Sequence, residues 1–316
     1  MHRYIIRRLL LAFPTLFIVS IAIFGMTRII PGDAVVAIVG DTGNISPAQL
    51  EGLRARLGLD KPFHTQYFVW IRGVLTGDLG DSYYTRKPVV KQLMSSIPIT
   101  LELAAIGLTL GMLFAIPLGI ISAIRQDTIS DYAARVLAVL GISMPNFWIA
   151  TMVVVYLGLF FAYLPPLGYS RIWEEPGRNL QQFYLPGMVL GFQLSGTTAR
   201  MVRSSMLEVL RQDYIRTALA KGLRERVVVT RHAVKNALIP VVTIIGNLMN
   251  GLIGGTVIIE TIFALPGVGQ LTIGAVTQRD YPQIQANIMF LATFLVLMNL
   301  VIDLTYGWLD PRIRYS

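Results

Sequence analysis

The sequence contains no cysteine and only three histidines among its 316 residues. Without cysteine there is no disulfide scaffold, no thiolate zinc site, no iron–sulfur cluster and no cysteine nucleophile. Charged residues are also scarce, at 14% of the chain, whereas soluble domains contain about 25%. A chain this poor in charge and 54% apolar is not expected to be an ordinary water-soluble domain.

The sequence also lacks the motifs of common catalytic sites. It has no Gly-x-x-x-x-Gly-Lys-Ser/Thr phosphate loop and no Gly-x-Ser-x-Gly nucleophile turn. Of its histidines, His64 is expected on the opposite side of a membrane from His2 and His232. We therefore expect no catalytic residues and no metal site, so that energy-coupled work would need an ATP site on another chain or an ion gradient.

Six uncharged stretches are long enough to cross a bilayer, which takes roughly 20 apolar residues as helix. They are 9–27, 103–124, 136–170, 179–199, 236–259 and 281–302. The third is too long for one span and contains Pro165-Pro166, so its helix is expected to end near Phe161. Backbone groups in lipid must bond internally, so an all-α membrane protein with six transmembrane helices is predicted.

Three prolines mark departures from straight spanning helices. Pro117 and Pro145 predict kinks in the second and third spans. The further uncharged run 261–278 contains Pro266 and three glycines. This run is expected to be a loop or a re-entrant element packed on protein.

Basic residues predict the orientation of the spans. Arg3, Arg7 and Arg8 precede a first run that is longer than a cleaved signal core, which indicates a retained signal-anchor helix. They place the N-terminus in the cytoplasm, and six spans return the C-terminus to the same side. Segment 200–235 decides this assignment, with nine Lys and Arg against three acidic residues. The net charge of +9 is then an orientation signal, and no nucleic-acid partner is expected.

The chain is expected to divide into four parts. Residues 1–30 form the N-terminus and first span, 31–97 an extracytoplasmic insertion, 98–306 the membrane core and 307–316 a cytoplasmic tail. Within the insertion, Ser46-Pro47-Ala48-Gln49 predicts a helix start. A second short helix is expected over 62–75, followed by a turn over 77–80.

The basic segment 200–235 contains a short amphipathic pattern. Ile215, Ala218, Leu219 and Gly222 recur at helical spacing, and Asp213 is placed to cap the helix. One interpretation is an interfacial helix lying on anionic lipid. The other is a docking helix, with Ala218 and Gly222 letting its backbone enter a groove of a cytoplasmic partner.

Polar residues near the spans have two interpretations. The charged residues near span ends are expected to be solvated, and they are Glu102, Glu260, Asp303 and Arg28. No acidic residue lies in the middle of a span, which disfavours an ion-driven carrier. In the fifth span the candidates for a translocation path are Asn247, Asn250, Gly251 and Gly254. Helix–helix packing through Gly251-x-x-x-Gly255 is the equal alternative.

Strings along nearly the whole chain resemble the permease subunits of dipeptide, oligopeptide and nickel ABC importers. They include Ile30-Pro31-Gly32-Asp33, Gly77-Asp78-Leu79-Gly80, Asp213-Tyr214-Ile215-Arg216-Thr217-Ala218, Ala220-Lys221-Gly222, Pro266-Gly267-Val268-Gly269 and Arg279-Asp280-Tyr281-Pro282. The long insertion 31–97 is similar to that of the B-type subunit.

The resemblance implies a type I ABC importer transmembrane domain in a bacterial inner membrane, with both termini cytoplasmic. The partners it implies are a second homologous permease, two cytoplasmic ATPases that hold ATP and Mg, a substrate-binding protein and membrane lipid. The chain itself would hold no cofactor and move solute by alternating access. The implied substrate is a short peptide, with a nickel chelate, glutathione or an oligosaccharide as alternatives. A different class of function, an ion-coupled secondary carrier, is the alternative to an ABC importer.

The resemblance also implies a coupling helix that contacts the ATPases. Its residues would be Asp213, Tyr214, Ile215, Arg216, Thr217, Ala218, Leu219, Ala220, Lys221 and Gly222. The Glu-Ala-Ala positions of the family motif fall on Arg216, Thr217 and Ala218, and its glycine falls on Gly222. Arg216 and Thr217 depart from the general motif, so no role that needs a carboxylate is expected at Arg216.

Overall fold

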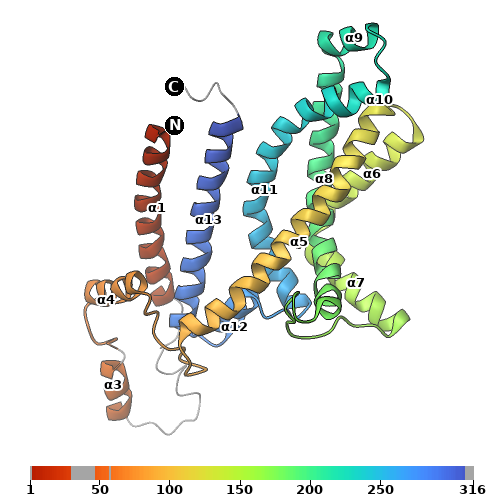
Figure 1. Ribbon diagram of the computed structural model, residues 1–316. Helices are drawn as coiled ribbons and strands as arrows, with labels where there is room; N and C mark the ends of the chain where they lie inside the picture. Colours follow the sequence, from red (N-terminus) through yellow and green to blue (C-terminus); the bar gives the residue numbers. More distant parts are fainter. Residues whose placement is uncertain (1, 30–46, 57, 310–316) are drawn as a thin grey trace. The chain divides into compact units, whose positions relative to one another are not determined.

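The computed structural model describes residues 2–29, 47–56 and 58–309, and these residues are mostly helical (Figure 1). In these ranges β pairing is limited to an isolated bridge between Asp81 and Pro88. The predicted all-α class is therefore confirmed. The motif over 30–33 and the tail 310–316 lie outside the described residues. The chain forms two compact units, one of residues 1–98 with 266–300 and one of residues 99–265 with 301–316.

The first unit contains the N-terminal helix and the helices of the insertion. Its elements are α1 (His2–Ile29), α3 (Pro47–Arg56), α4 (Phe63–Thr76), α12 (Val268–Thr277) and most of α13 (Tyr281–Leu309). Both helices expected in the insertion are confirmed, within a residue or two of their predicted ends. Within the run 261–278, expected to be a loop or a re-entrant element, the second half forms the ten-residue helix α12, so it is not a simple loop and the re-entrant element stays a prediction.

The insertion is fixed to the first span by aromatic packing. The ring of Phe24 on α1 lies 5.0 Å from that of Phe63, 5.6 Å from that of Tyr67 and 5.6 Å from that of Trp70, centroid to centroid. The hydroxyls of Ser20 and Tyr67 share a hydrogen bond of 2.8 Å. Edge-on aromatic pairs add stability beyond their burial, so α4 lies against the predicted outer part of α1.

A buried carboxylate connects the insertion to the start of α13. Asp280 is 3% exposed, and it accepts hydrogen bonds from the Ser82 hydroxyl and, at 3.0 Å, from the Tyr83 backbone N–H. Gln285 Nε2 donates to Thr27 Oγ1 at 2.8 Å, which joins α13 to α1. Segments 198 and 258 residues apart in sequence are therefore held together by side chains at the start of α13.

The second unit is built around one long helix, α8 (Figure 1). Helices α6, α7 and α11 pack on it, and glycine contacts place α5 against it as well. The elements of this unit are α5 (Val89–Ile124, which starts in the first unit), α6 (Ile129–Ser143), α7 (Asn146–Phe161), α8 (Pro176–Leu210), α9 (Asp213–Ala220), α10 (Glu225–Val227), the π-helix η1 (Val228–Ala233) and α11 (Val234–Ile262).

The helix of the third predicted span is interrupted at Pro145, whereas the helix of the second predicted span continues past Pro117. Helices α6 and α7 meet at 100°, because Met144 is extended and Pro145 has no N–H to continue the ladder. The expected kink is therefore a break, although the helix ends at Phe161 as predicted. Helix α5 is continuous across Pro117.

Three helices of the described chain, α1, α5 and α13, are long and apolar enough to cross a membrane. The bent pair of α6 and α7 adds a fourth if it is one span. Helices α8 and α11 have 35 and 29 residues and are not among these candidate spans, although Leu248–Ile262 of α11 is a shorter apolar helical stretch. The number of six transmembrane spans therefore remains a prediction.

Paired glycines bring α8 into backbone contact with its neighbours. A Cβ atom on Gly191 of α8 would lie 2.8 Å from the backbone nitrogen of Gly111 on α5, and one on Gly196 would lie 2.5 Å from the carbonyl oxygen of Ala138 on α6. Contacts this short leave no room for a side chain. Of the two glycines in Gly251-x-x-x-Gly255, a Cβ on Gly255 would lie 3.2 Å from Asn146 Nδ2, whereas one on Gly251 meets nothing within 4 Å in the described part of the chain.

Replacing Gly191 by alanine is expected to destabilise the protein by about 1–3 kcal/mol, because the new methyl group forces α5 away from α8. The matched control is Gly251→Ala, which places the same methyl group in open space and gains up to about 1 kcal/mol of helix propensity. Thermal unfolding of the detergent-purified variants measures both. Equal midpoints for the two variants would contradict the packing.

Candidate functional site

Helix α9 lies at the end of the second unit where α8 ends and α10 begins (Figure 1). The predicted short helix is confirmed, but Asp213 is its first helical residue, and Gln212 occupies the N-cap without a side-chain bond. The carboxylate of Asp213 still suits the positive end of the helix. Gly222 ends the helix with a φ of +79°, a backbone conformation that favours glycine.

The apolar stripe of α9 faces its own chain. Ile215 and Ala218 are 2% and 9% exposed, and they join the core cluster that includes Val228, Val229 and Ala233 of η1. Ala218 is therefore covered by this chain, which differs from the expectation that it enters a partner's groove. Gly222 is exposed, and a Cβ there would meet nothing within 4 Å.

The outward side of α9 is polar at its centre and apolar at its margins. Arg216, Thr217 and Ala220 are exposed on the side opposite the buried stripe. Tyr214 and Leu219 flank the stripe and remain 42% and 46% exposed. This mixture of exposed aromatic, aliphatic and arginine side chains is typical of a protein interface.

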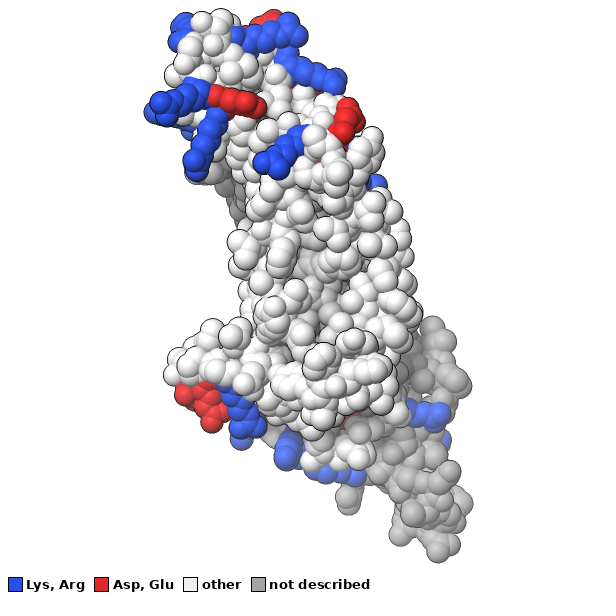
Figure 2. All heavy atoms as spheres, turned by 90° about the vertical axis from the view of Figure 1, so that its right-hand side faces the viewer, with Lys and Arg blue, Asp and Glu red and all other residues white. Residues whose placement is uncertain are grey.

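Positive charge surrounds α9. Figure 2 shows Lys and Arg gathered at the upper end of the view, with a broad uncharged band below them. Lys221, Arg224, Arg226 and Arg231 follow α9 and are exposed. The Tyr214 hydroxyl is held by a 2.9 Å hydrogen bond from Asn236 Nδ2 of α11, so this surface is positioned by the core of the unit.

A buried ion network lies beside this end of α8. We call Asp131, Ser122, Arg203 and Arg135 the ion network. Asp131 is fully buried and accepts hydrogen bonds from the Ser122 hydroxyl, from Arg203 Nε and Nη2 at 3.1 Å each, and from the Asp127 backbone N–H at 3.1 Å. The charge is therefore well paired, which a buried carboxylate requires.

The ion network was not predicted from the sequence, because residues 125–135 fall between the predicted spans 103–124 and 136–170 and no packing was predicted for them. The helix begins earlier than the apolar run, at Ile129, so Asp131 lies inside its first turn. The spacing of Asp131 and Arg135 at i and i+4 was a usable signal. The other partners, Ser122 and Arg203, lie on α5 and α8 and are not marked by any local pattern.

Two acidic residues expected to be solvated are instead packed on protein. Glu260 is fully buried and accepts a 2.6 Å hydrogen bond from Thr100 Oγ1. Glu102 accepts from Asn179 Nδ2 at 2.6 Å and from the Tyr169 hydroxyl at 3.0 Å. Burial, reinforced by the bond to Glu102, raises the pKa of Tyr169 to about 12. The side chains of Arg28 and Asp303 lie outside the described ones.

The candidates for a translocation path all lie on α11, but their surroundings differ. Gly251 and Gly254 are exposed, and a Cβ on either meets nothing within 4 Å. Asn250 is half-buried, and the side chain of Asn247 lies outside the described ones. A Cβ on Gly255 would lie 3.2 Å from Asn146 Nδ2 of α7, so the packed side of α11 begins there. Gly251 and Gly254 thus mark an open side of α11.

No group of three or more His, Asp or Glu side chains in the described ranges is arranged to hold a metal ion. The arrangement of this end of the unit is suited to contact with another molecule. Exposed cations and apolar side chains lie on short helices, and these are held by a packed core.

Replacing Asp131 by asparagine is expected to destabilise the protein by about 3 kcal/mol, because Arg203 loses its buried counter-charge. The matched control is Asp127→Asn, where the side chain is 72% exposed and the change should be within about 0.5 kcal/mol. Thermal unfolding in detergent measures both variants. A midpoint for Asp131→Asn equal to that of the control would contradict the buried pairing.

The chain matches two family models along its length. Residues 115–315 match the model of the binding-protein-dependent transport system inner membrane component. Residues 1–104 match the model of the N-terminal part of the same membrane component. The boundary between them falls within α5.

Curated relatives match the chain from end to end. It is 39% identical to the dipeptide transport system permease protein DppB of Escherichia coli (strain K12), over 100% of both chains. It is 38% identical, again over 100% of both chains, to DppB of Alkalihalophilus pseudofirmus and to a putative peptide transport system permease protein of Brucella abortus (strain 2308).

Solved structures show the same fold at low sequence identity. An inward-facing structure of the MetNI methionine ABC transporter matches with a TM-score of 0.56 at 16% identity, covering 69% of this chain and 96% of that one. A chain of an amino acid ABC transporter matches with a TM-score of 0.50 at 16% identity, covering 67% and 92%. The expected type I ABC importer fold is therefore confirmed.

The two family models together cover nearly the whole chain, and the relatives match it over its full length. The chain belongs to the family of binding-protein-dependent transport system inner membrane components.

Proposed function

We propose that this chain is the membrane-spanning subunit of an ATP-driven importer of short peptides. The observation that carries the proposal is α9, a short helix anchored by a buried stripe with its other side exposed among cations. A helix of this kind can transmit a movement, because its outward side is available to a partner while its inward side moves with the core. The full-length similarity to dipeptide permeases supports peptide as the substrate.

The proposed assembly has two permeases, two ATPases and one substrate-binding protein. ATP and Mg would be held by the ATPases, and this chain would perform no covalent chemistry. Both termini and α9 would lie in the cytoplasm, because nine Lys and Arg occupy segment 200–235. The insertion that contains α3 and α4 would then face outward, toward the binding protein.

The proposed mechanism is alternating access. ATP binding would move the ATPases together, and α9 would pass this movement to α8 and η1 through the buried contacts of Ile215 and Ala218. Helices α8 and α11 pack on each other, so a displacement at α9 reaches the open side of α11 at Gly251 and Gly254. These glycines, with Asn247 and Asn250, are the proposed lining of the path.

An ion-coupled carrier is the second candidate, and the buried Glu260 is the observation in its favour. An ionisable side chain inside a membrane protein is a default candidate for an ion path. However, Glu260 accepts a hydrogen bond from Thr100, which supports a structural role. Solute accumulation by vesicles that contain this chain without an ATPase would favour the carrier.

Replacing Ala220 by glutamate is expected to weaken ATPase binding about 30-fold, which corresponds to ~2 kcal/mol at an interface hot spot. The thermal midpoint of the chain should not change, because Ala220 is exposed. Pull-down of the ATPase and peptide uptake by reconstituted vesicles measure the effect.

Two alanine-to-glutamate controls separate docking from folding. Ala218→Glu should lower the thermal midpoint of the chain itself, because Ala218 is buried. Ala48→Glu, on the exposed surface of α3, should change neither property. Normal uptake with Ala220→Glu would argue against coupling through α9.

The absence of cysteine makes the orientation directly testable. Lys221→Cys should react with a membrane-impermeant maleimide in broken cells and not in intact ones, whereas Lys87→Cys should react in intact cells, because both positions are exposed on opposite predicted sides. The unsubstituted chain is the control, since it has no thiol. Labelling of Lys221→Cys in intact cells would reverse the proposed topology.

A further inference from the structure

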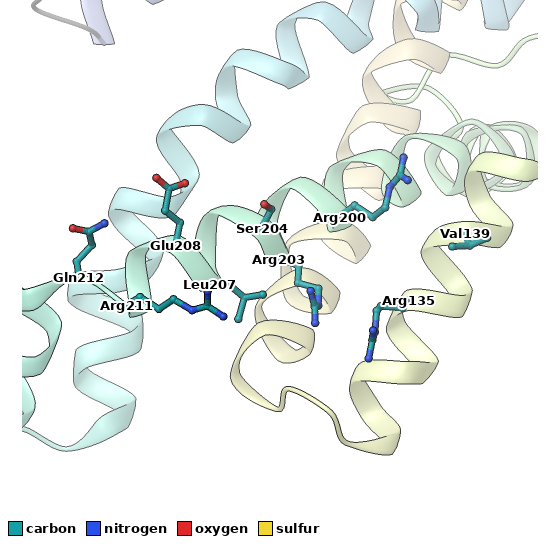
Figure 3. A pocket seen from close by; sticks show the side chains of 9 residues that line it. All are labelled: Arg135, Val139, Arg200, Arg203, Ser204, Leu207, Glu208, Arg211 and Gln212. Carbon is teal, nitrogen blue, oxygen red and sulfur yellow. The ribbon is translucent and has the colours of Figure 1, made fainter.

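A cavity of about 670 Å³ lies between α6 and α8, next to the ion network (Figure 3). Four of its lining residues are arginines, namely Arg135, Arg200, Arg203 and Arg211. Glu208 is the acidic residue that lines it, and its side chain extends to the other side of α8 from that of Arg203 (Figure 3). The four arginines, Glu208 and the buried Asp131 together have a net charge of +2.

Two of the four guanidinium groups, those of Arg200 and Arg211, keep their donors available for an anion. Arg203 uses Nε and Nη2 on Asp131. Arg135 is engaged too, because its Nη2 lies 3.0 Å from Asp131 Oδ2 and 3.8 Å from Asp127 Oδ1, and its guanidinium carbon lies 4.4 Å from the Tyr132 ring centroid. In the same part of the chain, Arg200 and Arg211 have no acidic side chain within salt-bridge distance. Forked guanidinium donors match the oxygens of a phosphate group.

The cavity opens beside an exposed apolar helix face. Val139 of α6 lines the cavity and is 51% exposed, while its neighbours Val136 and Leu140 are 58% and 42% exposed. A soluble anion needs no such face next to its binding site. A molecule with a phosphate head and hydrocarbon chains fits both parts at once.

We propose that this cavity binds the headgroup of an anionic phospholipid, with the acyl chains along Val136, Val139 and Leu140 of α6. Basic pockets between transmembrane helices bind such headgroups. The site lies within the second unit and is independent of the transported substrate. Because Arg211 and Gln212 line it just before α9, bound lipid would also hold the last turn of α8 in place.

The test uses the full-length chain, with the subunits that co-purify, in nanodiscs of phosphatidylglycerol and phosphatidylcholine in equal amounts. After extraction into detergent, native mass spectrometry counts the lipids that remain bound. We expect selective retention of phosphatidylglycerol by the wild type. The variant Arg200→Gln with Arg211→Gln should retain it about 30-fold more weakly, at about 1 kcal/mol for each arginine.

Two further variants control for charge loss and for misfolding. Arg226→Gln with Arg231→Gln removes the same charge from exposed positions near α9 that do not line the cavity, and retention should change less than about threefold. Arg211→Gln alone changes one exposed side chain and should weaken retention about fivefold. Equal retention in the wild type and in both cavity variants would overturn the proposal.

Two other outcomes would assign the cavity to a different ligand and also overturn the proposal. Release of phosphatidylglycerol from the wild type by excess inorganic phosphate, with no preference over phosphatidylcholine afterwards, would identify a site for a soluble anion. Loss of co-purifying ATPase from the Arg200 and Arg211 variant, with lipid retention unchanged, would identify a protein-docking surface.

Discussion

The close approach of α8 to its neighbours is the constraint on which the second unit depends. Gly191 faces Gly111 of α5, and Gly196 faces the backbone of α6 at Ala138. In a membrane there is little hydrophobic gain from bringing helices together, so dispersion contacts between closely packed backbones have to supply the stability. Helix α8 can therefore contain polar residues along its length and still form the centre of the unit.

A second consequence of this packing is that charge can be buried at the end of α8. Arg203 reaches Asp131 because α6 and α8 lie close together, and Ser122 completes the pair from α5. Three helices are thus joined by polar bonds at the point where the chain leaves the apolar core and enters its basic segment. The cavity with four arginines lies directly beside this junction, so its shape follows from the same helix contacts.

The position of α9 shows how far local pattern can mislead. Periodicity identified the helix and its apolar residues correctly, and the φ of +79° at Gly222 agrees with the expected helix end. Periodicity could not tell which body the stripe would contact. The tertiary structure places Ile215 and Ala218 on η1 and leaves Ala220 and Arg216 outward, so a partner would meet the side of α9 opposite the predicted one.

The sequence by itself determined the helical class, the positions of the long apolar helices and the membership of a transport family, because apolar run length, turn residues and motif order are local properties. Only the tertiary structure decided that Glu260 is buried, that the span at Pro145 is broken by 100°, and that Ser122, Asp131 and Arg203 form one ion network. The burial of Glu260 and the ion network depend on contacts between residues up to 160 positions apart, and no local pattern encodes which helices will be neighbours.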